Sequence, residues 1–131
     1  MNLFKVKVLL DTNILLAPGQ LGIDVFSELD RIITDRYLLC TFDSVLGELK
    51  SLIEKDRSQQ SFNAKLGYVM VNQRKVKTLP STTSYSDKCI SDFSKSNKCI
   101  VVTQDKALRK KVQSHGNKTI GIRQKKYLDF F

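Results

Sequence analysis

The chain has 131 residues, of which 41% are hydrophobic, and it carries 22 Lys and Arg against 13 Asp and Glu, a formal net charge of +9. This length and hydrophobic fraction predict a single folded domain over residues 1–131 and exclude a largely disordered chain. No apolar run approaches the roughly 20 residues that a membrane-spanning helix needs. The excess of positive charge favours a polyanionic partner, usually nucleic acid, over a membrane surface.

The N-terminal segment and the cysteines together indicate a cytoplasmic protein. The opening "MNLFKVKVLLDTN" contains a lysine and an apolar run, but it lacks a small-residue cleavage site and leads directly into Asp11. It therefore reads as a β-strand and not as a signal peptide. Cys40, Cys89 and Cys99 show no CxxC spacing, and their odd number leaves one unpaired. Reduced, structural cysteines are the simplest interpretation.

Strand and helix patterns alternate along the chain. Strands are predicted at residues 5–10, 37–42, 75–80, 98–104 and 118–124, and helices at 22–35, 44–55, 58–74, 86–96 and 105–115. Such alternation predicts an α/β fold with a parallel sheet and helices on both faces. The stretch "CIVVT" is apolar enough for a strand buried on both sides. Residues from about 123 to 131 are read as a basic C-terminal tail.

Four acidic residues are predicted to lie on one rim of this sheet. Asp11 and Asp105 follow the first strand and the strand "CIVVTQ", while Glu48 and Asp87 lie near the amino ends of helices. In parallel α/β sheets, strand carboxyl ends and helix amino ends meet at the same edge, where sites form. Each acid also has an ordinary explanation. Asp105 can cap a helix, Asp11 can be a turn residue, Asp87 can complement a helix dipole and Glu48 can be a surface residue.

A cluster of carboxylates indicates a hard divalent cation. Clustered acids repel one another unless a cation neutralises them or some of them are protonated. Oxygen ligands without nearby His or Cys suit Mg²⁺ or Mn²⁺, and zinc is disfavoured. The single histidine, His115, falls at the end of a predicted helix, where a capping role is expected. In a basic protein, such a metal points to phosphate chemistry, with Asn13 and Thr103 as groups that orient the carboxylates.

The C-terminal third supplies candidate contacts to nucleic acid. Between Lys106 and Tyr127 basic residues follow one another without an intervening acid. Those taken as weak candidates for contacts to RNA phosphates are Lys106, Arg109, Lys110, Arg123, Lys125 and Lys126. Binding through them should weaken as salt rises. No aromatic-rich motif of the RRM kind indicates a base-stacking platform.

Four segments in this order resemble the PIN-domain nucleases: "LLDTNILL", "SVLGELKSL", "SYSDKCI" and "VVTQDKALRKKV". The stretches "APGQLGIDVFSELDRI" and "IGIRQKKYLDFF" further resemble the small archaeal PIN proteins related to ribosomal-RNA-processing endonucleases.

The resemblance implies a three-layer α/β/α sandwich, metal-dependent hydrolysis of RNA and a homodimer. Mapped onto this chain, it assigns catalysis and metal binding to Asp11, Glu48, Asp87 and Asp105. It assigns supporting roles to Asn13 and Thr103.

Two departures from the family pattern keep other functions open. Many relatives have a further acid where this chain has Lys88, and some have another where it has Ala107. The resemblance therefore implies that a second metal ion binds weakly or only when substrate is present. One alternative is a toxin-type PIN ribonuclease with an antitoxin partner. Another is a non-catalytic RNA-binding or assembly factor. A haloacid-dehalogenase-type phosphatase fits poorly, because Asn13 stands where that family has its second Asp.

Overall fold

The computed structural model describes residues 5–55 and 58–131. Its elements in chain order are β1 Val6–Leu10, α1 Thr12–Leu21, α2 Val25–Ile32, β2 Tyr37–Phe42, α3 Asp43–Lys55, α4 Gln59–Gln73, β3 Lys77–Leu79, α5 Ser86–Ser96, β4 Cys99–Val102, α6 Lys106–Ser114, β5 Lys118–Arg123 and β6 Tyr127–Phe130. They form a sheet with the order β3-β2-β1-β4-β5-β6, in which β1 to β5 are parallel and β6 pairs antiparallel with β5.

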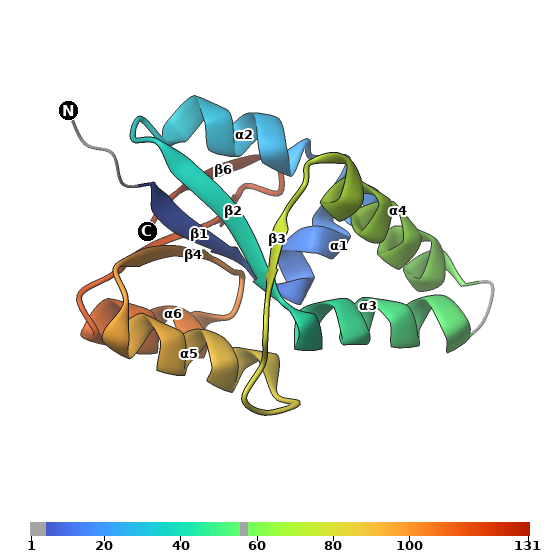
Figure 1. The fold of residues 1–131 in the computed structure, drawn as a ribbon. Coiled ribbons are helices and arrows are strands. Elements are labelled where there is room, and N and C mark those ends of the chain that lie inside the picture. Colours follow the sequence, from blue (N-terminus) through green and yellow to red (C-terminus); the bar gives the residue numbers. More distant parts are fainter. Residues whose placement is uncertain (1–4, 56–57) are drawn as a thin grey trace.

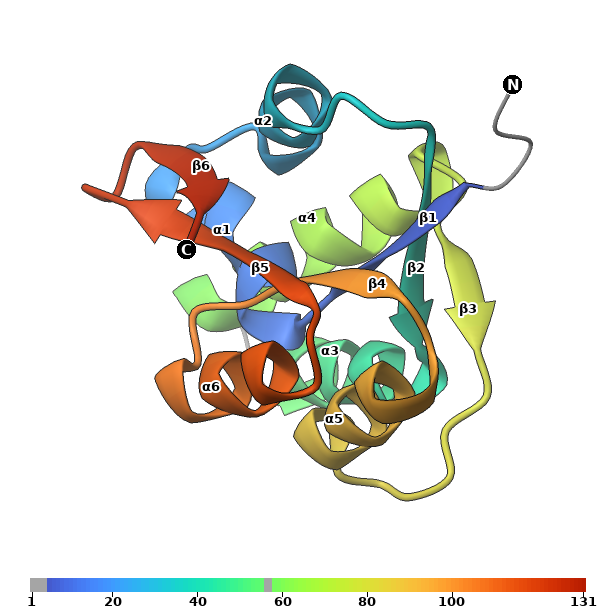
Figure 2. The same ribbon diagram turned by 90° about the vertical axis from the view of Figure 1, so that its left-hand side faces the viewer.

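Helices cover both faces of the sheet, which confirms the predicted three-layer α/β/α architecture. Figure 2 shows α5 and α6 together on one face and α1, α2 and α4 on the other. Helix α3 leads away from the carboxyl end of β2 and packs against α4 (Figure 1). Among the described residues, no helix is long and apolar enough to cross a bilayer.

The core lies between these layers and is built mainly from the central strands. All four residues of β4 are buried, as the apolar stretch "CIVVT" predicted. Leu9 and Leu10 of β1 are fully buried beside them. Cys40, Cys89 and Cys99 are buried free thiols, which agrees with the expectation of structural cysteines. The two most buried strands, β1 and β4, are therefore neighbours at the centre of the sheet.

Helix α1 was not predicted, because its sequence contains two residues that disfavour helices. Pro18 lacks a backbone donor and Gly19 has high conformational freedom, yet both lie within α1. The buried side chains of Ile14, Leu15, Leu16 and Ala17 explain why tertiary packing prevails. Gly22, with a positive φ of 68°, ends this helix instead of beginning the next. The helix predicted from residue 22 to 35 is accordingly shorter, at Val25–Ile32.

The segment predicted as a basic C-terminal tail is instead the second half of a β-hairpin. Residues Arg123 to Lys126 form the turn, in which Lys126 N–H donates to the Arg123 carbonyl at 3.0 Å. Gln124 and Lys125 have φ values of 53° and 57°, a conformation that usually selects Asn or Gly. Burial of Leu128 in β6 fixes the hairpin against the sheet.

Candidate functional site

The candidate site lies where the strand order of the sheet reverses. From β1 the chain proceeds to β2 and β3 on one side, and then crosses to β4 and β5 on the other. The carboxyl ends of β1 and β4 consequently border the crevice in which α/β proteins bind their ligands. Asp11 directly follows β1, and Asp105 follows β4 after a short loop. Figure 1 shows the amino ends of α1 and α3 meeting at this edge.

The structure brings all four predicted acids to one cavity. An open cavity of about 340 Å³ is lined by Asp11, Glu48, Asp87 and Asp105, with Asn13 also in its wall. These carboxylates come from four segments that lie far apart in the sequence, so local sequence alone does not place them together. We call this the carboxylate cavity.

Asp11 is the buried member of the set and is held by both predicted supporting residues. The residue is 8% exposed. Its carboxylate accepts hydrogen bonds from the Thr103 hydroxyl at 2.6 Å, the Thr12 backbone N–H at 2.8 Å and the Asn13 side-chain amide at 3.3 Å. Thr103 Oγ1 in turn accepts from the Asp105 N–H at 3.1 Å. This network joins the ends of β1 and β4 and fixes the orientation of Asp11.

Burial raises the pKa of Asp11 above its ordinary value of 3.8. The hydrogen bonds from Thr103 and Thr12 act in the opposite direction, and the negative charges of Glu48 and Asp105 raise the pKa further. The negative charges of Glu48 and Asp105 are thus close enough to destabilise the ionised form of Asp11. A cation in this cavity would remove that penalty.

Asp105 and Asp87 each accept hydrogen bonds from backbone N–H groups at a helix amino end and also line the cavity. Asp105 Oδ1 accepts from the backbone N–H groups of Ala107 and Leu108 at 2.9 and 3.1 Å, so it caps α6 as the ordinary explanation expected. Asp87 Oδ1 accepts from the Lys88 N–H at 2.9 Å in the first turn of α5. The Oδ2 atoms of both residues make no hydrogen bond to any residue that the structure describes, and each remains available to a ligand.

Glu48 is oriented by two hydroxyl groups that the sequence analysis did not single out. Thr12 Oγ1 donates to Glu48 Oε2 at 2.6 Å, and Ser86 Oγ donates to Oε1 at 2.5 Å. One hydroxyl belongs to α1 and the other to α5, so the carboxylate is held between two helix amino ends. The available signal was their position, because Thr12 and Ser86 are immediate neighbours of Asp11 and Asp87.

We expect Ser86→Ala to lower the rate of RNA cleavage by about 10- to 100-fold, the usual range when a group that orients a ligating or reacting side chain is lost. Ser86→Thr should restore most of the rate because it keeps the hydroxyl. Ser84→Ala, at an exposed serine in the same cavity wall, is the matched control. Single-turnover cleavage assays would measure these effects. Equal rates for Ser86→Ala and Ser84→Ala would contradict the positioning role.

Lys88 directly follows Asp87 in the sequence, and Tyr85 precedes it by two residues. Lys88 stands where the family resemblance led us to expect a further acid. Its ammonium lies 4.0 Å from the carboxylate of Asp92, one helical turn further on, and it does not line the carboxylate cavity. Both side chains of this pair are exposed, so the pair adds little stability. Tyr85 is 68% exposed in the cavity wall. An exposed aromatic ring in the polar loop "STTSYSD" is a residue that could stack on a base, and the sequence analysis missed it.

The predicted basic contacts fall into two groups. Lys106, Lys110, Lys125 and Lys126 are exposed. Arg109 and Arg123 instead pack on the Phe131 ring, with guanidinium carbons 3.8 and 4.1 Å from its centroid. Arg109 also donates to the Thr103 carbonyl, and Arg123 to the Phe130 carbonyl, both at 3.2 Å. These arginines stabilise the C-terminal hairpin, which makes them poorer candidates for RNA phosphates than the lysines.

The donor set of the carboxylate cavity fits a hard divalent ion. All its candidate ligands are oxygens, the type that Mg²⁺ and Mn²⁺ prefer. His115 lies at the end of α6, where its Nδ1 is 2.7 Å from Ser94 Oγ, as the prediction of a terminal role expected. Within residues 5–55 and 58–131, however, no three His, Cys, Asp or Glu side chains are close enough to enclose an ion directly. Water molecules or substrate oxygens would have to complete its coordination.

The raised pKa of Asp11 predicts how pH changes stability when no metal is added. A buried carboxyl with a raised pKa binds its proton more tightly in the folded state than in the unfolded state. The free energy of unfolding of the wild type, relative to Asp11→Asn, should therefore fall as pH rises from about 4 toward neutrality. Thermal melts of both proteins in EDTA would measure this. Parallel pH profiles would show that Asp11 is not destabilised by its surroundings.

The order of motifs, the topology and the position of the acids define a PIN-domain nuclease. The family profile described as a PIN like domain matches residues 8–125, nearly the whole chain, so the protein belongs to this family. Ribonuclease VapC4 of Methanocaldococcus jannaschii is 24% identical over 126 residues, which cover 95% of this chain and 96% of that relative. The structure of the PIN domain endonuclease Utp24 superposes with a TM-score of 0.75 at 23% identity, over 95% of this chain and 90% of that one. The second likeness shows a shared fold.

Proposed function

We propose that this protein is a metal-dependent endoribonuclease that hydrolyses RNA phosphodiester bonds at the carboxylate cavity. The observation that carries the proposal is the arrangement of Asp11, Glu48, Asp87 and Asp105 around one cavity at the switch point of a PIN-domain sheet. A second support is that a related chain of nearly equal length is a ribonuclease. The net charge of +9 suits a polyanionic substrate.

The chain's own residues divide the chemical work in this proposal. Asp11, Asp87 and Asp105 would hold Mg²⁺ or Mn²⁺, and such an ion, when bound, can activate water and neutralise developing charge on phosphoryl oxygens. Glu48 would orient the attacking water, since its carboxylate is fixed by two hydroxyl donors. Lys106, exposed beside Asp105, would contact a phosphate of the substrate.

The substrate that we propose is precursor ribosomal RNA, processed in the cytoplasm by a homodimer. The substrate and the homodimer are proposed from the resemblance of the chain, including segments 17–32 and 120–131, to the small archaeal PIN proteins. The cytoplasmic location is proposed from the N-terminal segment and the cysteines. The toxin reading would instead require a small antitoxin partner bound to the chain. Cleavage of a precursor ribosomal RNA fragment, compared with transfer RNA and messenger RNA of equal length, separates the two roles.

The test of the proposal is cleavage of a labelled, structured RNA by the wild type with Mg²⁺, with Mn²⁺ and with EDTA. Cleavage that starts with the metal and stops with EDTA supports the nuclease. A protein that binds the RNA tightly but never cuts it, with either ion and across all three RNA classes, would be a binding or assembly factor on a nuclease fold. A DNA strand of the same sequence tests whether the 2′-hydroxyl is required.

A further inference from the structure

A second cavity lies at the opposite edge of the sheet from the carboxylate cavity. It has a volume of about 230 Å³ and lies between the end of α2 and the amino ends of β1, β4 and β5. Its walls include the apolar side chains of Val6, Ile32, Ile100 and Phe130. Nothing in the proposed cleavage reaction uses this cavity. We call it the amino-edge cavity.

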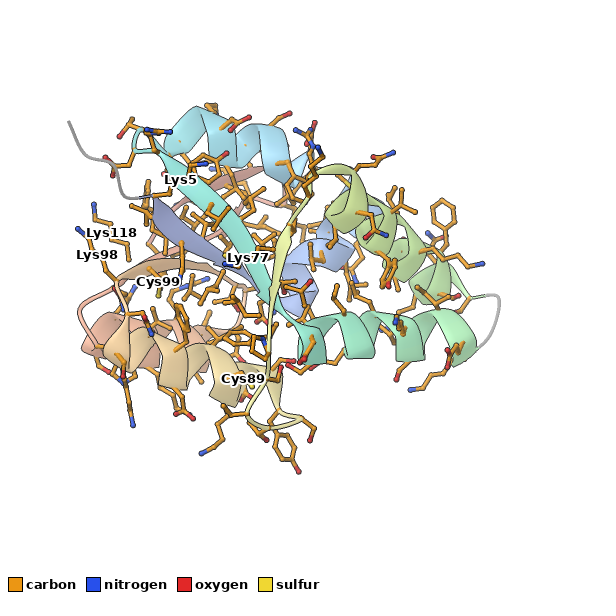
Figure 3. The ribbon with its side chains drawn as sticks, viewed as in Figure 1. Lys5, Lys77, Cys89, Lys98, Cys99 and Lys118 are labelled. Carbon is orange, nitrogen blue, oxygen red and sulfur yellow. The ribbon has the colours of Figure 1, made fainter. Side chains whose placement is uncertain are left out.

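Two lysines border the amino-edge cavity, and strand register explains why both do. Lys118 of β5 pairs with Ile100 of β4, so their side chains share one face of the sheet. Lys98 precedes Ile100 by two residues and therefore tends to point to that face as well. Both lysines line the cavity, and Figure 3 shows them at the same end of the molecule, beyond the amino end of β1.

The charge of these lysines is left largely uncompensated. The ion pairs of the described residues are Arg31 with Glu28, Lys88 with Asp92 and Arg123 with Asp129, and none involves Lys98 or Lys118. Asp35 is the acid among the described residues that line the cavity, and it is exposed. The Lys118 ammonium lies 5.8 Å from the centroid of the Phe130 ring. The cavity thus combines an apolar and aromatic wall with a cationic rim.

We propose that the amino-edge cavity binds a single-stranded segment of the RNA that the carboxylate cavity cleaves. The identity of this ligand rests on the proposed function. Lys98 and Lys118 contact backbone phosphates, and one base packs against Phe130 and Ile32. This pairing of cations with an aromatic wall is how proteins bind single strands without reading their sequence. The five residues of β1 separate the two edges, a span of about 17 Å. The bound segment is therefore several nucleotides away from the cut.

The experiment measures binding of a labelled single-stranded RNA of about 30 nucleotides by fluorescence anisotropy, in EDTA so that no cleavage occurs, across a range of salt concentrations. Each phosphate contact contributes a slope of about −0.7 to the dependence of log affinity on log salt for single strands. We expect K98Q/K118Q to make this slope shallower by about 1.4.

The matched control is K55Q/K65Q, which removes the same charge from exposed lysines of α3 and α4. An unchanged slope for this control, with the shallower slope for K98Q/K118Q, supports the inference. An equal loss in both variants would show a net-charge effect and overturn the inference. An unchanged slope in K98Q/K118Q would overturn it as well.

Cleavage of the long RNA with Mg²⁺ is assayed separately. If the wild type cuts but the slope stays unchanged, the inference fails and the proposed function stands. If the slope falls but nothing is cut, the proposed function fails alone.

Discussion

Replacing Asp11 with Asn is expected to reduce RNA cleavage by about 10³-fold, which corresponds to about 4 kcal/mol of transition-state stabilisation. The amide has nearly the same shape and can still accept from the Thr12 N–H, so the backbone at the end of β1 should stay in place. It removes, however, the buried negative charge that Glu48 and Asp105 surround. Single-turnover cleavage with saturating Mn²⁺ measures the loss, and isothermal titration of the metal shows whether ion binding is lost with it.

The control for this variant is Asp92→Asn, which removes the same charge from an exposed position on α5 outside the carboxylate cavity. It should leave the rate unchanged within about twofold, as is usual for surface substitutions away from a site. RNA affinity of Asp11→Asn should be equal to or higher than that of the wild type, because a negative charge near the phosphates is gone. If Asp11→Asn cleaved as fast as Asp92→Asn, Asp11 would have no part in the chemistry.

The strands and the rim of acids could be predicted because their signals are local. A fully apolar stretch such as "CIVVT" needs burial on both faces, and the structure places it at the centre of the sheet. An acid that directly follows such a strand must lie at its carboxyl end. Asp11 and Asp105 therefore lie at the edge where they were predicted, although their catalytic roles stay predictions.

Helix α1 and strand β6 could not be predicted because contacts from distant parts of the chain determine them. Pro18 and Gly19 disfavour a helix locally, and the close packing of α1 on α4 outweighs that preference. The hairpin turn has Gln124 and Lys125 at positive φ, where Asn or Gly would have been the recognisable signal. Without that signal, the segment read as a basic tail.

The hydroxyls that hold Glu48 could not be predicted from the sequence either. Serine and threonine are common at helix amino ends, so Thr12 and Ser86 carry no distinctive pattern. Their role depends on the amino-terminal parts of α1, α3 and α5 meeting at Glu48. The sequence identified the charged groups of the site and the two neutral residues that support Asp11, whereas the hydroxyls that orient Glu48 became visible only in three dimensions.

Gly67→Ala is expected to lower the free energy of unfolding by about 2 kcal/mol, which corresponds to a drop of roughly 6–10 °C in melting temperature for a domain of this size. Gly67 lies on the face of α4 that contacts α1, where a Cβ atom would come within 2.3 Å of the Leu15 carbonyl oxygen. Because this neighbour is backbone, it cannot rotate away, and α1 must shift. Thermal and urea unfolding, followed by circular dichroism, would measure the loss.

Gly47→Ala is the matched control, because Gly47 is an exposed glycine within α3 where an added Cβ atom would meet nothing within 4 Å. Alanine here should stabilise the protein by about 0.5–1 kcal/mol, since it reduces the conformational freedom of the unfolded chain. The two substitutions are thus expected to have opposite signs. A displaced α1 also moves Thr12 and Asp11 at its amino end, so Gly67→Ala should lose cleavage activity below its melting temperature. If Gly67→Ala were destabilised but fully active, the carboxylate cavity would tolerate movement of α1. Equal stability of Gly67→Ala and Gly47→Ala would contradict the close contact between α1 and α4.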